Sequence, residues 1–470
     1  MRKTNILFVV AGLFVAALIS SCTDKNTKVK LPNEEVISIV REAYVYAFPL
    51  VLTDATRLSY NGVDNVLAHA KGFPDHTFRN VVAPNNDTNY SSAFLQLKEE
   101  PVVIEIPDTD GRYYVFPFLD AWTNNFKLVG KRTTGTEEQK YLVSGPDWKG
   151  EVPAGLEQIQ APTNLVWVIG RTQVNSKEDQ EKVVSPLQDK YKLTTLSKWL
   201  ANDPTSSSDR VIYNASLALS IEQGNVLNAV KSLSVEDFFN YFSELLADNP
   251  PVPQDNALIK RLASVGIGVG ERFSLDRFDA EIQEAVKNVP EEIYAAINEA
   301  AVGKKDIYGN VTSDKNARLG YFEKDYNWRA VVAYLGMGAL TPEEATYFVG
   351  NFDSENQVLD GHNNYIIHFD SGKLPPAEAF WSLTIYDKDR YLSENPIKRY
   401  AIGDRDSLKY NADGSLDIYL THQAPSKDKL ANWLPVPNDI FSSNLRIFSP
   451  TPEFVKDQST WQNPLPVRVK

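Results

Sequence analysis

Residues 102–126, VVIEIPDTDGRYYVFPFLDAWTNNF, carry the strongest structural signal in the chain. Residues 102–106 place a branched apolar side chain at every second position, which is the period of a β-strand with one buried face. Residues 108–111, Asp-Thr-Asp-Gly, favour a tight turn, and residues 112–118 return as an aromatic strand. The stretch therefore predicts two β-strands joined by a turn.

The same period of two extends over about residues 80–174 and returns near the C-terminus. Residues 411–414, Asn-Ala-Asp-Gly, form a hairpin-type turn signal in the second of these regions. The further strands that this pattern predicts are 141–144, 165–169, 364–369, 380–386 and 416–421.

Between about residues 176 and 330 the apolar spacing changes to that of helices. An earlier helix is expected to begin at Asn33, a capping residue followed by two glutamates, and Pro49 is expected to end or kink it. The glycine-rich residues 266–270 fit neither a dinucleotide fingerprint nor a phosphate-binding loop, and they predict a connection between helices. The helices expected in the middle region are 193–200, 235–246 and 278–301, the last one broken at Pro290.

The first residues have the order of an export signal: Arg2 and Lys3 supply positive charge, and residues 6–19 are mainly apolar. This apolar run is shorter than the roughly 20 residues that a transmembrane helix needs. The small pair directly before Cys22 resembles the lipobox of bacterial lipoproteins, in which the cysteine is acylated and becomes the first residue of the mature protein. An ordinary signal that contains a cysteine is the alternative.

We therefore expect residues 1–21 to be a cleaved signal peptide and Cys22 to carry the lipid that anchors the protein in a membrane. Residues 22–32 then form a polar tether. An aspartate directly after the cysteine would indicate the inner membrane, but Thr23 stands there. The expected location is the cell envelope at the outer membrane, on a face that the sequence leaves open.

Composition narrows the chemistry of the body. Cys22 is the only cysteine in 470 residues, so the mature body has no disulfide, no zinc–cysteine site and no cysteine nucleophile. The net charge of −13 argues against nucleic acid as a partner. Neither a serine-hydrolase elbow, a zinc-protease helix nor an EF-hand loop is present, and no cofactor is expected. His362 and His368 are six residues apart, but Asp360-Gly361 suggests a turn at the first of them, so no metal site is predicted.

Two polar and aromatic stretches contain the candidate site residues. Residues 82–92 are rich in amide and carboxylate side chains that orient a polar substrate, although such residues also bond their own backbone in Asx turns. Residues 112–126 place arginine, aspartate and tryptophan at a strand end, where they line a pocket or form an aromatic core with a buried arginine–aspartate pair. The candidate catalytic residues are Asp87, Arg112 and Asp120, and the candidate substrate-binding residues are Asn86, Thr88, Tyr90, Tyr114, Trp122 and Asn125.

At these same stretches the sequence resembles bacterial proteins that join two domains of unknown function, catalogued as 1254 (N-terminal) and 1214 (C-terminal). The N-terminal resemblance rests on APNNDTNYSS (83–92), residues 102–126, RTTG (132–135), GPDW (145–148) and APTNLVWVIGR (161–171). The C-terminal resemblance rests on LDGHNNYIIHF (359–369), LPPAEAFWSLTIYD (374–387), NPIKRYAIGD (395–404), ADGSLDIYL (412–420) and NWLPVP (432–437).

The resemblance implies an α+β multidomain protein with an N-terminal β-sandwich, a mainly helical middle domain and a C-terminal jelly-roll-like β-sandwich. It supplies no reaction and no catalytic residue. The expected domains are 33–175 for the N-terminal helix and β-sandwich, 176–335 for the helical domain and 336–470 for the C-terminal β domain.

Three hypotheses on function follow. A hydrolase acting on a small polar or carbohydrate-like substrate is favoured by the clustering of polar residues where two β segments end. The alternatives are a non-catalytic glycan- or protein-binding protein and a structural role in an oligomeric assembly. A homo-oligomer is compatible with the last of these. A closed pocket that joins Asp87, Arg112 and Asp120 would favour the enzyme, whereas separation of the two carboxylates would remove that hypothesis. Glycosidase chemistry, for example, needs two carboxylates roughly 5–9.5 Å apart.

Overall fold

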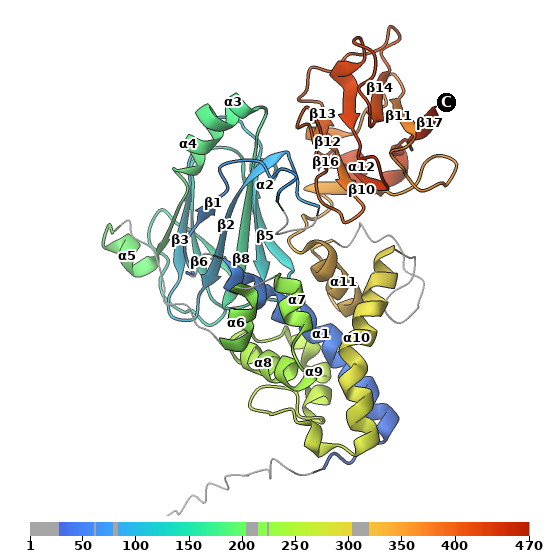
Figure 1. Ribbon diagram of the computed structural model, residues 1–470. Helices are drawn as coiled ribbons and strands as arrows, with labels where there is room; N and C mark the ends of the chain where they lie inside the picture. The colour runs from blue at the N-terminus through green and yellow to red at the C-terminus, as the bar shows by residue number, and fades with distance from the viewer. Residues whose placement is uncertain are drawn as a thin grey trace, which may run out of the picture.

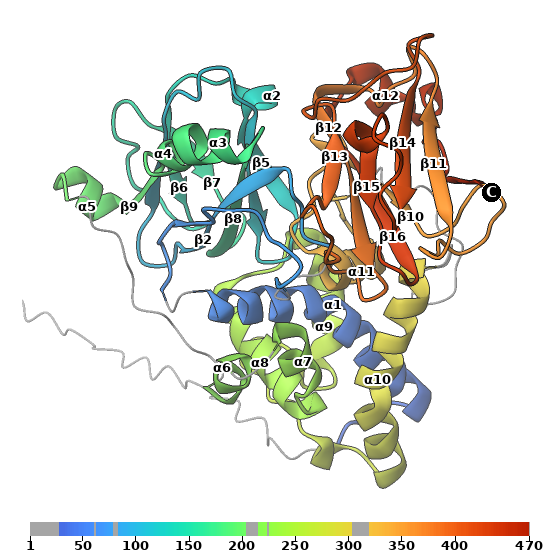
Figure 2. The same ribbon diagram turned by 45° about the horizontal axis from the view of Figure 1, so that its top comes forward.

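The computed structural model describes residues 28–60, 63–78, 83–203, 215–222, 225–302 and 319–469. The predicted signal peptide and Cys22 lie outside the described residues. Two β domains lie side by side above a helical body, and the long helix α1 (Asn33–Ser59) runs beneath both of them (Figures 1 and 2). The predicted α+β class with β, helical and β regions in that order is confirmed.

The N-terminal β domain consists of two sheets that face each other across an apolar core. Residues 102–106 form a strand, as their alternation predicts, and the aromatic strand begins two residues later than expected, at Tyr114. In spatial order the five-stranded sheet contains β1 (Ala68–His69), β2 (Thr88–Gln96), β8 (Leu165–Gln173), β4 (Tyr114–Asp120) and β5 (Asn125–Gly130). The second sheet contains β7 (Glu157–Gln160), β6 (Gln139–Ser144), β3 (Val102–Ile106) and β9 (Lys192–Thr195).

The helix predicted over residues 193–200 is wrong in its first half. Residues 192–195 form β9, which pairs antiparallel with β3 and places Leu193 opposite Ile104. Two consecutive β-branched threonines favour this extended backbone, and the strand covers an otherwise open edge of β3. The remaining short helices of this domain are α2 (Lys131–Thr134), α3 (Lys177–Asp179), the π-helical turn η1 (Gln180–Val184), α4 (Ser185–Gln188) and α5 (Leu196–Leu200).

The helical body forms around α1, most of whose residues from 43 onward are buried by the helices that surround it. The helix has the length and hydropathy of a membrane span, but 78% of its apolar window is buried inside the protein, so packing accounts for its composition. The surrounding helices are α6 (Ala215–Glu222), α7 (Val226–Lys231), α8 (Val235–Asp248), α9 (Asn256–Ala263), α10 (Ala280–Val302) and α11 (Tyr326–Gly336), with short 3-10 turns η2 (Pro253–Asp255) and η3 (Leu275–Arg277).

Two prolines do not interrupt the helices in which they stand. Helix α1 continues through Pro49 to Ser59, so this proline does not end the helix, and a kink there stays a prediction. Helix α10 continues through Pro290 to Val302, so the predicted break at Pro290 is wrong. A proline removes one backbone hydrogen bond and crowds the preceding turn. Burial of the apolar residues on both sides of each proline offsets that cost.

The C-terminal β domain is a sandwich of two four-stranded sheets around one core, as the jelly-roll-like expectation requires. The predicted strands 364–369 and 416–421 are confirmed as β11 and β14. One sheet contains β10 (Ala345–Gly350), β16 (Phe441–Pro450), β12 (Ala377–Asp387) and β13 (Ala401–Gly403), and the other contains β15 (Trp433–Pro435), β14 (Leu416–Thr421), β11 (Asn364–Phe369) and β17 (Val467–Val469). Short helices η5 (Leu430–Asn432), α12 (Pro452–Lys456) and η6 (Gln458–Thr460) complete the domain.

Apolar contacts join the three parts. Leu119 and Trp167, on the outer face of the five-stranded sheet, belong to the same core as the helical body. Between the two β domains, Tyr113 packs edge-on against Phe380 and Phe448. Tyr113 and Leu119, which take part in these contacts, are direct neighbours in sequence of the candidates Arg112, Tyr114 and Asp120.

Candidate functional site

The two candidate carboxylates lie at opposite ends of the five-stranded sheet. The carbonyl oxygen of Asp87 accepts from the backbone N–H of Val174 at one end of β8, whereas Asp120 is paired with Val166 near the other end. Eight residues separate these partners along an extended strand, which corresponds to about 26 Å at ~3.3 Å per residue. This separation far exceeds the 5–9.5 Å of a glycosidase pair, so a single site that uses both carboxylates is wrong.

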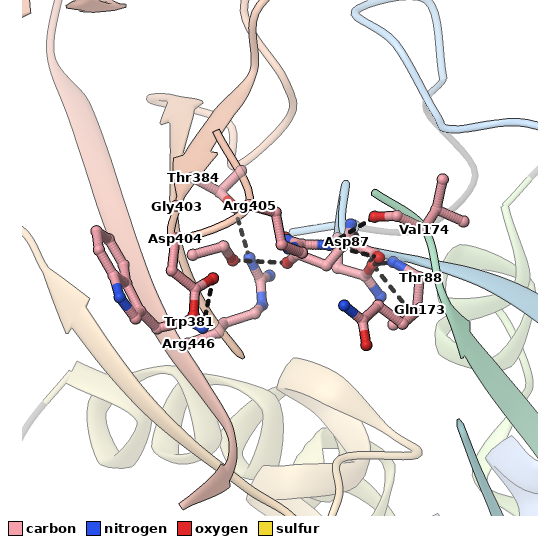
Figure 3. Close-up of polar contacts among 12 residues, drawn as sticks. Asp87, Thr88, Gln173, Val174, Trp381, Thr384, Gly403, Asp404, Arg405 and Arg446 are labelled. Atoms are coloured by element: carbon pink, nitrogen blue, oxygen red, sulfur yellow. Dashed lines mark hydrogen bonds and ion pairs between the residues drawn. The ribbon is translucent and has the colours of Figure 1, made fainter. Parts of the chain in front are cut away.

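Asp87 lies at the junction of the two β domains, where its carboxylate is fully buried (Figure 3). Its Oδ1 accepts from Nη2 of Arg405, and its Oδ2 accepts from the hydroxyl of Ser382 at 2.6 Å. Nη1 of Arg405 also donates to the carbonyls of Asp87, at 3.0 Å, and Val174, at 2.8 Å. The guanidinium stands 4.1 Å from the ring centroid of Phe380. Both carboxylate oxygens of Asp87 are thus occupied by the other domain.

A second buried arginine extends this junction. Arg446 donates to Thr384 at 2.9 Å, to the hydroxyl of Tyr386 at 2.6 Å and to the carbonyl of Ala83 at 3.0 Å. Nearby Asp404 accepts from the backbone N–H of Trp381 at 3.3 Å. Loss of hydration raises the pKa of Asp404 to about 6, and the Arg405 cation acts in the opposite direction. These contacts fasten the loop before β2 to the C-terminal domain.

Residues 85–90 form an Asx turn, the structural alternative considered for this stretch. Oδ1 of Asn85 accepts from the backbone N–H groups of Asp87 and Thr88, each at 3.0 Å, and from the Thr88 hydroxyl at 3.2 Å. Asn85 also donates to the Tyr90 hydroxyl, and Asn86 donates to the carbonyl of Pro74 at 2.9 Å. The candidate binding residues Asn86, Thr88 and Tyr90 are therefore bound within the protein.

Arg112 pairs with Asp179 rather than with Asp120. Its two terminal nitrogens bind the Asp179 carboxylate at 2.8 and 2.6 Å, and Nη1 also donates to the carbonyl of Gln173. Tyr114, next to it on β4, donates to the carbonyl of Gly135 at 3.1 Å. Arg112 thus contacts Gln173, the strand partner of Thr88, but its cation is paired with Asp179, and neither Arg112 nor Tyr114 shares a site with Asp120.

Asp120 closes the turn between β4 and β5. Its Oδ1 accepts from the backbone N–H groups of Trp122 and Asn124, both at 2.9 Å, and its Oδ2 accepts from the Asn124 side chain at 2.9 Å. Burial raises the pKa of this carboxyl above its usual range. Thr123, in the same turn, has a φ of 70°, a left-handed conformation that is unfavourable for a β-branched residue, and its hydroxyl has no partner among the described residues. This turn is strained and locally capped.

A cavity of about 380 Å³ opens against this turn. Its walls come from residues 120–125 of the β4–β5 turn, residues 252–255 before α9 and residues 320–329, which lead into α11. A side chain at Gly320, whose φ is 76°, would collide with the amide of Asn125, so glycine keeps this wall close to the turn. The β domain and the helical body together form the cavity.

Several buried polar groups of the cavity wall have no hydrogen-bond partner among the residues that the structure describes. They are Nε and Nη2 of Arg329, Nε1 of Trp122 and Oδ1 of Asn125. Arg329 is 2% exposed, and its guanidinium carbon lies 5.0–5.2 Å from the ring centroids of Tyr46, Trp122 and Tyr326. Because an unpaired buried polar group costs free energy, four such groups around one cavity make it the candidate binding site.

A second carboxylate of the wall, that of Asp255, is also occupied. Asp255 accepts from the hydroxyls of Tyr46, at 3.0 Å, and Tyr326. Neither Asp255 nor Arg329 was predicted from the sequence. The run DYNWR at residues 325–329 resembles in composition the two candidate stretches, 82–92 and 112–126. Nothing in the sequence, however, links it to residues 120–125.

The two histidines considered for metal binding, His362 and His368, pair with carboxylates of their own domain. His362 binds Asp360 and His368 binds Asp417, each at 2.6 Å. Over the described part of the chain, no group of three or more histidine, cysteine, aspartate and glutamate residues is arranged to hold a metal ion.

Comparisons with known proteins agree with this architecture. The model of the protein of unknown function DUF1254 matches residues 65–195, and that of the protein of unknown function DUF1214 matches residues 344–452. No curated protein matches.

Two solved structures resemble the chain. The VPA0106 protein from Vibrio parahaemolyticus is 24% identical, with a TM-score of 0.69 over 93% of this chain and 100% of that one, a likeness of fold. An uncharacterised protein from Burkholderia cenocepacia is 12% identical, with a TM-score of 0.41 over 91% of this chain and 88% of that one. With both family models matched in the expected order, the chain belongs to the proteins that join these two domains of unknown function, 1254 ahead of 1214.

Proposed function

We propose that this protein is a lipid-anchored protein of the cell envelope that binds a small polar ligand in the cavity between the β4–β5 turn and the helical body. The observation that carries the proposal is the set of unpaired polar groups on buried Arg329, Trp122 and Asn125 around one cavity. Its volume of about 380 Å³ falls within the roughly 300–1,000 Å³ of small-molecule sites.

The geometry supports binding over hydrolysis. Hydrolysis by paired carboxylates requires two acidic groups near one substrate bond. Asp87 is bound to Arg405 in the domain junction, and Asp120 is capped by its own turn. Both carboxylates have structural partners, which removes the reason for preferring a hydrolase.

Ligand screening tests this proposal. The full chain is incubated with a library of sugars, organic acids and peptides, and stabilisation is followed by thermal unfolding, since a ligand at 100 times its Kd adds about 2.7 kcal/mol. Gln254 is exposed at the cavity wall, and Gln254→Trp is expected to abolish the shift by filling the entrance. Gln462→Trp, an exposed position in the C-terminal domain, is the matched control and should keep the shift. Equal shifts in both variants, or no stabilising compound, would contradict the proposal.

The envelope location rests on the leader and on Cys22, and it needs a separate test. Cell fractionation should recover the wild-type chain in the membrane pellet, with labelled palmitate incorporated. Cys22→Ser should release the protein into the soluble fraction and remove the label. A soluble wild-type protein without label would contradict the lipid anchor while leaving the cavity proposal standing.

A further inference from the structure

Arg329 lines the cavity with part of its hydrogen-bonding capacity unused. Its two unpaired nitrogens, Nε and Nη2, lie on the same edge of the planar guanidinium. Two parallel N–H groups on one edge match the two oxygens of a carboxylate, which makes the strongest pairing that arginine forms. The cation is buried in the first turns of α11, where bulk water does not replace such a partner.

The acidic neighbours do not supply that partner. Asp120 takes its donors from the β4–β5 turn, and Asp255 takes its donors from Tyr46 and Tyr326. Nε and Nη2 of Arg329 have no acceptor anywhere in the described residues. The two N–H groups on this edge of Arg329, called the fork below, therefore have no partner within the described residues.

The guanidinium is held in place without its hydrogen bonds. The rings of Tyr46, Trp122 and Tyr326 surround it at 5.0–5.2 Å, and cation–π attraction to each ring keeps its plane fixed. Such preorganisation lowers the entropy that a ligand loses on binding. A side chain that served only to fill space would not need a charged end in this position.

Two further unpaired atoms define the rest of the ligand. Nε1 of Trp122 offers a donor and Oδ1 of Asn125 offers an acceptor, and a hydroxyl group satisfies either. Glu323, together with Asp120 and Asp255, adds negative charge to the wall, which disfavours a second negative charge on the ligand. From these contacts we propose that the cavity binds a small monocarboxylate that carries at least one hydroxyl group, with the carboxylate on the Arg329 fork. This inference rests on the proposed binding function and deepens it.

Matched acids and amides test the ligand class. Calorimetric titration of the full chain with lactate, mandelate and glucuronate, each beside its primary amide, separates charge from shape. At least one acid is expected to bind at least about tenfold more tightly than its amide, because the amide cannot neutralise the buried cation. Arg329→Gln should weaken binding of that acid by about 30-fold or more, and Arg329→Lys, which keeps the charge without the fork, by about tenfold.

Selectivity distinguishes a binding role from a structural one. Arg329→Gln should lower the acid-to-amide preference to near one, whereas a general loss of packing would weaken both compounds in parallel. Arg468→Gln, at an exposed position on β17, is the control and should retain the wild-type preference. Equal affinity for acid and amide, unchanged affinity in Arg329→Gln, or no binding of any acid would overturn the inference. In each of these cases the proposed binding function would still stand if a neutral library compound bound to the wild type and Gln254→Trp abolished that binding.

Discussion

The junction around Asp87 and the cavity around Arg329 are built from the same kinds of side chains. They differ in how many of their buried polar groups have hydrogen-bond partners. Each has a buried charge, an arginine and aromatic rings. At the junction, both oxygens of Asp87 are paired, and both terminal nitrogens of Arg405 and Nη2 of Arg446 donate across the domain boundary. Among the described residues, one nitrogen of this cluster, Nε of Arg405, has no partner. In the cavity, Arg329 keeps two unpaired nitrogens.

That difference separates a structural cluster from a ligand site. A fully paired polar network rigidifies and fixes the arrangement of the parts that it joins. An incompletely paired network costs free energy in the empty protein, and a ligand that completes it recovers that cost on binding. Judged by burial and residue type alone, Asp87 would be a stronger candidate for a functional residue than Arg329.

Removing the carboxylate at the junction should give the largest effect on stability. Asp87→Ala leaves Arg405 without its ion-pair partner, and the loss of one partner of a buried pair costs about 3–5 kcal/mol. Urea unfolding measures the change, and hydrogen exchange at residues 83–90 and 401–406 locates it. Asp189→Ala breaks an exposed pair with Lys71 and is expected to leave the stability nearly unchanged. Similar losses in the two variants would mean that the junction does not hold the domains.

Relief of strain beside the cavity should act in the opposite direction. Thr123 adopts a φ of 70°, and Thr123→Gly is expected to stabilise the fold by about 1 kcal/mol because glycine has no side chain to oppose that conformation. Thr123→Ala keeps the backbone strain and removes the unpaired hydroxyl, so it separates the effect of the strain on stability from that of the hydroxyl. Thermal unfolding checks both variants. A lower melting temperature in Thr123→Gly would show that the threonine is not strained.

The local pattern of the sequence predicted much of the fold. Residues 364–369 and 416–421 are strands with the expected bounds, because alternation of buried and exposed side chains is a local property. Pro290 misled the prediction, since tertiary packing stabilises the helix that contains it. Residues 193–195 misled it as well, because their partner is β3, far earlier in the chain.

The candidate site was predicted less well, for a related reason. Trp122 and Asn125 do line the cavity, but Asp87 and Arg112 belong elsewhere. The partner of Asp87 stands 318 residues later. Composition indicates which residues are polar, whereas function here depends on which of them remain unpaired after folding. Only the three-dimensional structure contains that information.

Replacing Arg329 tests whether this side chain is needed for stability or only for the proposed ligand binding. Arg329→Met removes a buried cation with two unmade hydrogen bonds and keeps an apolar side chain among three rings. The loss of cation–π attraction and the gain from removing a buried charge oppose each other, so stability should stay within about 1 kcal/mol of the wild type. Urea unfolding without ligand measures it. A loss as large as that of Asp87→Ala would place Arg329 with the structural cluster.

The smallest expected effect concerns pH at the junction. The pKa of Asp404 is raised to about 6 by loss of hydration, so the folded state holds the proton more tightly than the unfolded chain does. A raised pKa gives a stabilising contribution that is present below the unfolded value, about 3.9, and is lost as the pH rises through the folded value. The wild type should therefore lose stability relative to Asp404→Asn between about pH 4 and pH 6. The difference should be small, because Asp404 is exposed to solvent and water screens its charge. Unfolding midpoints of both proteins across this range measure it. If the stability of the wild type instead rises relative to Asp404→Asn with increasing pH, the Arg405 cation outweighs the loss of hydration at Asp404. Asp404, like Asp87, would then belong to the paired network.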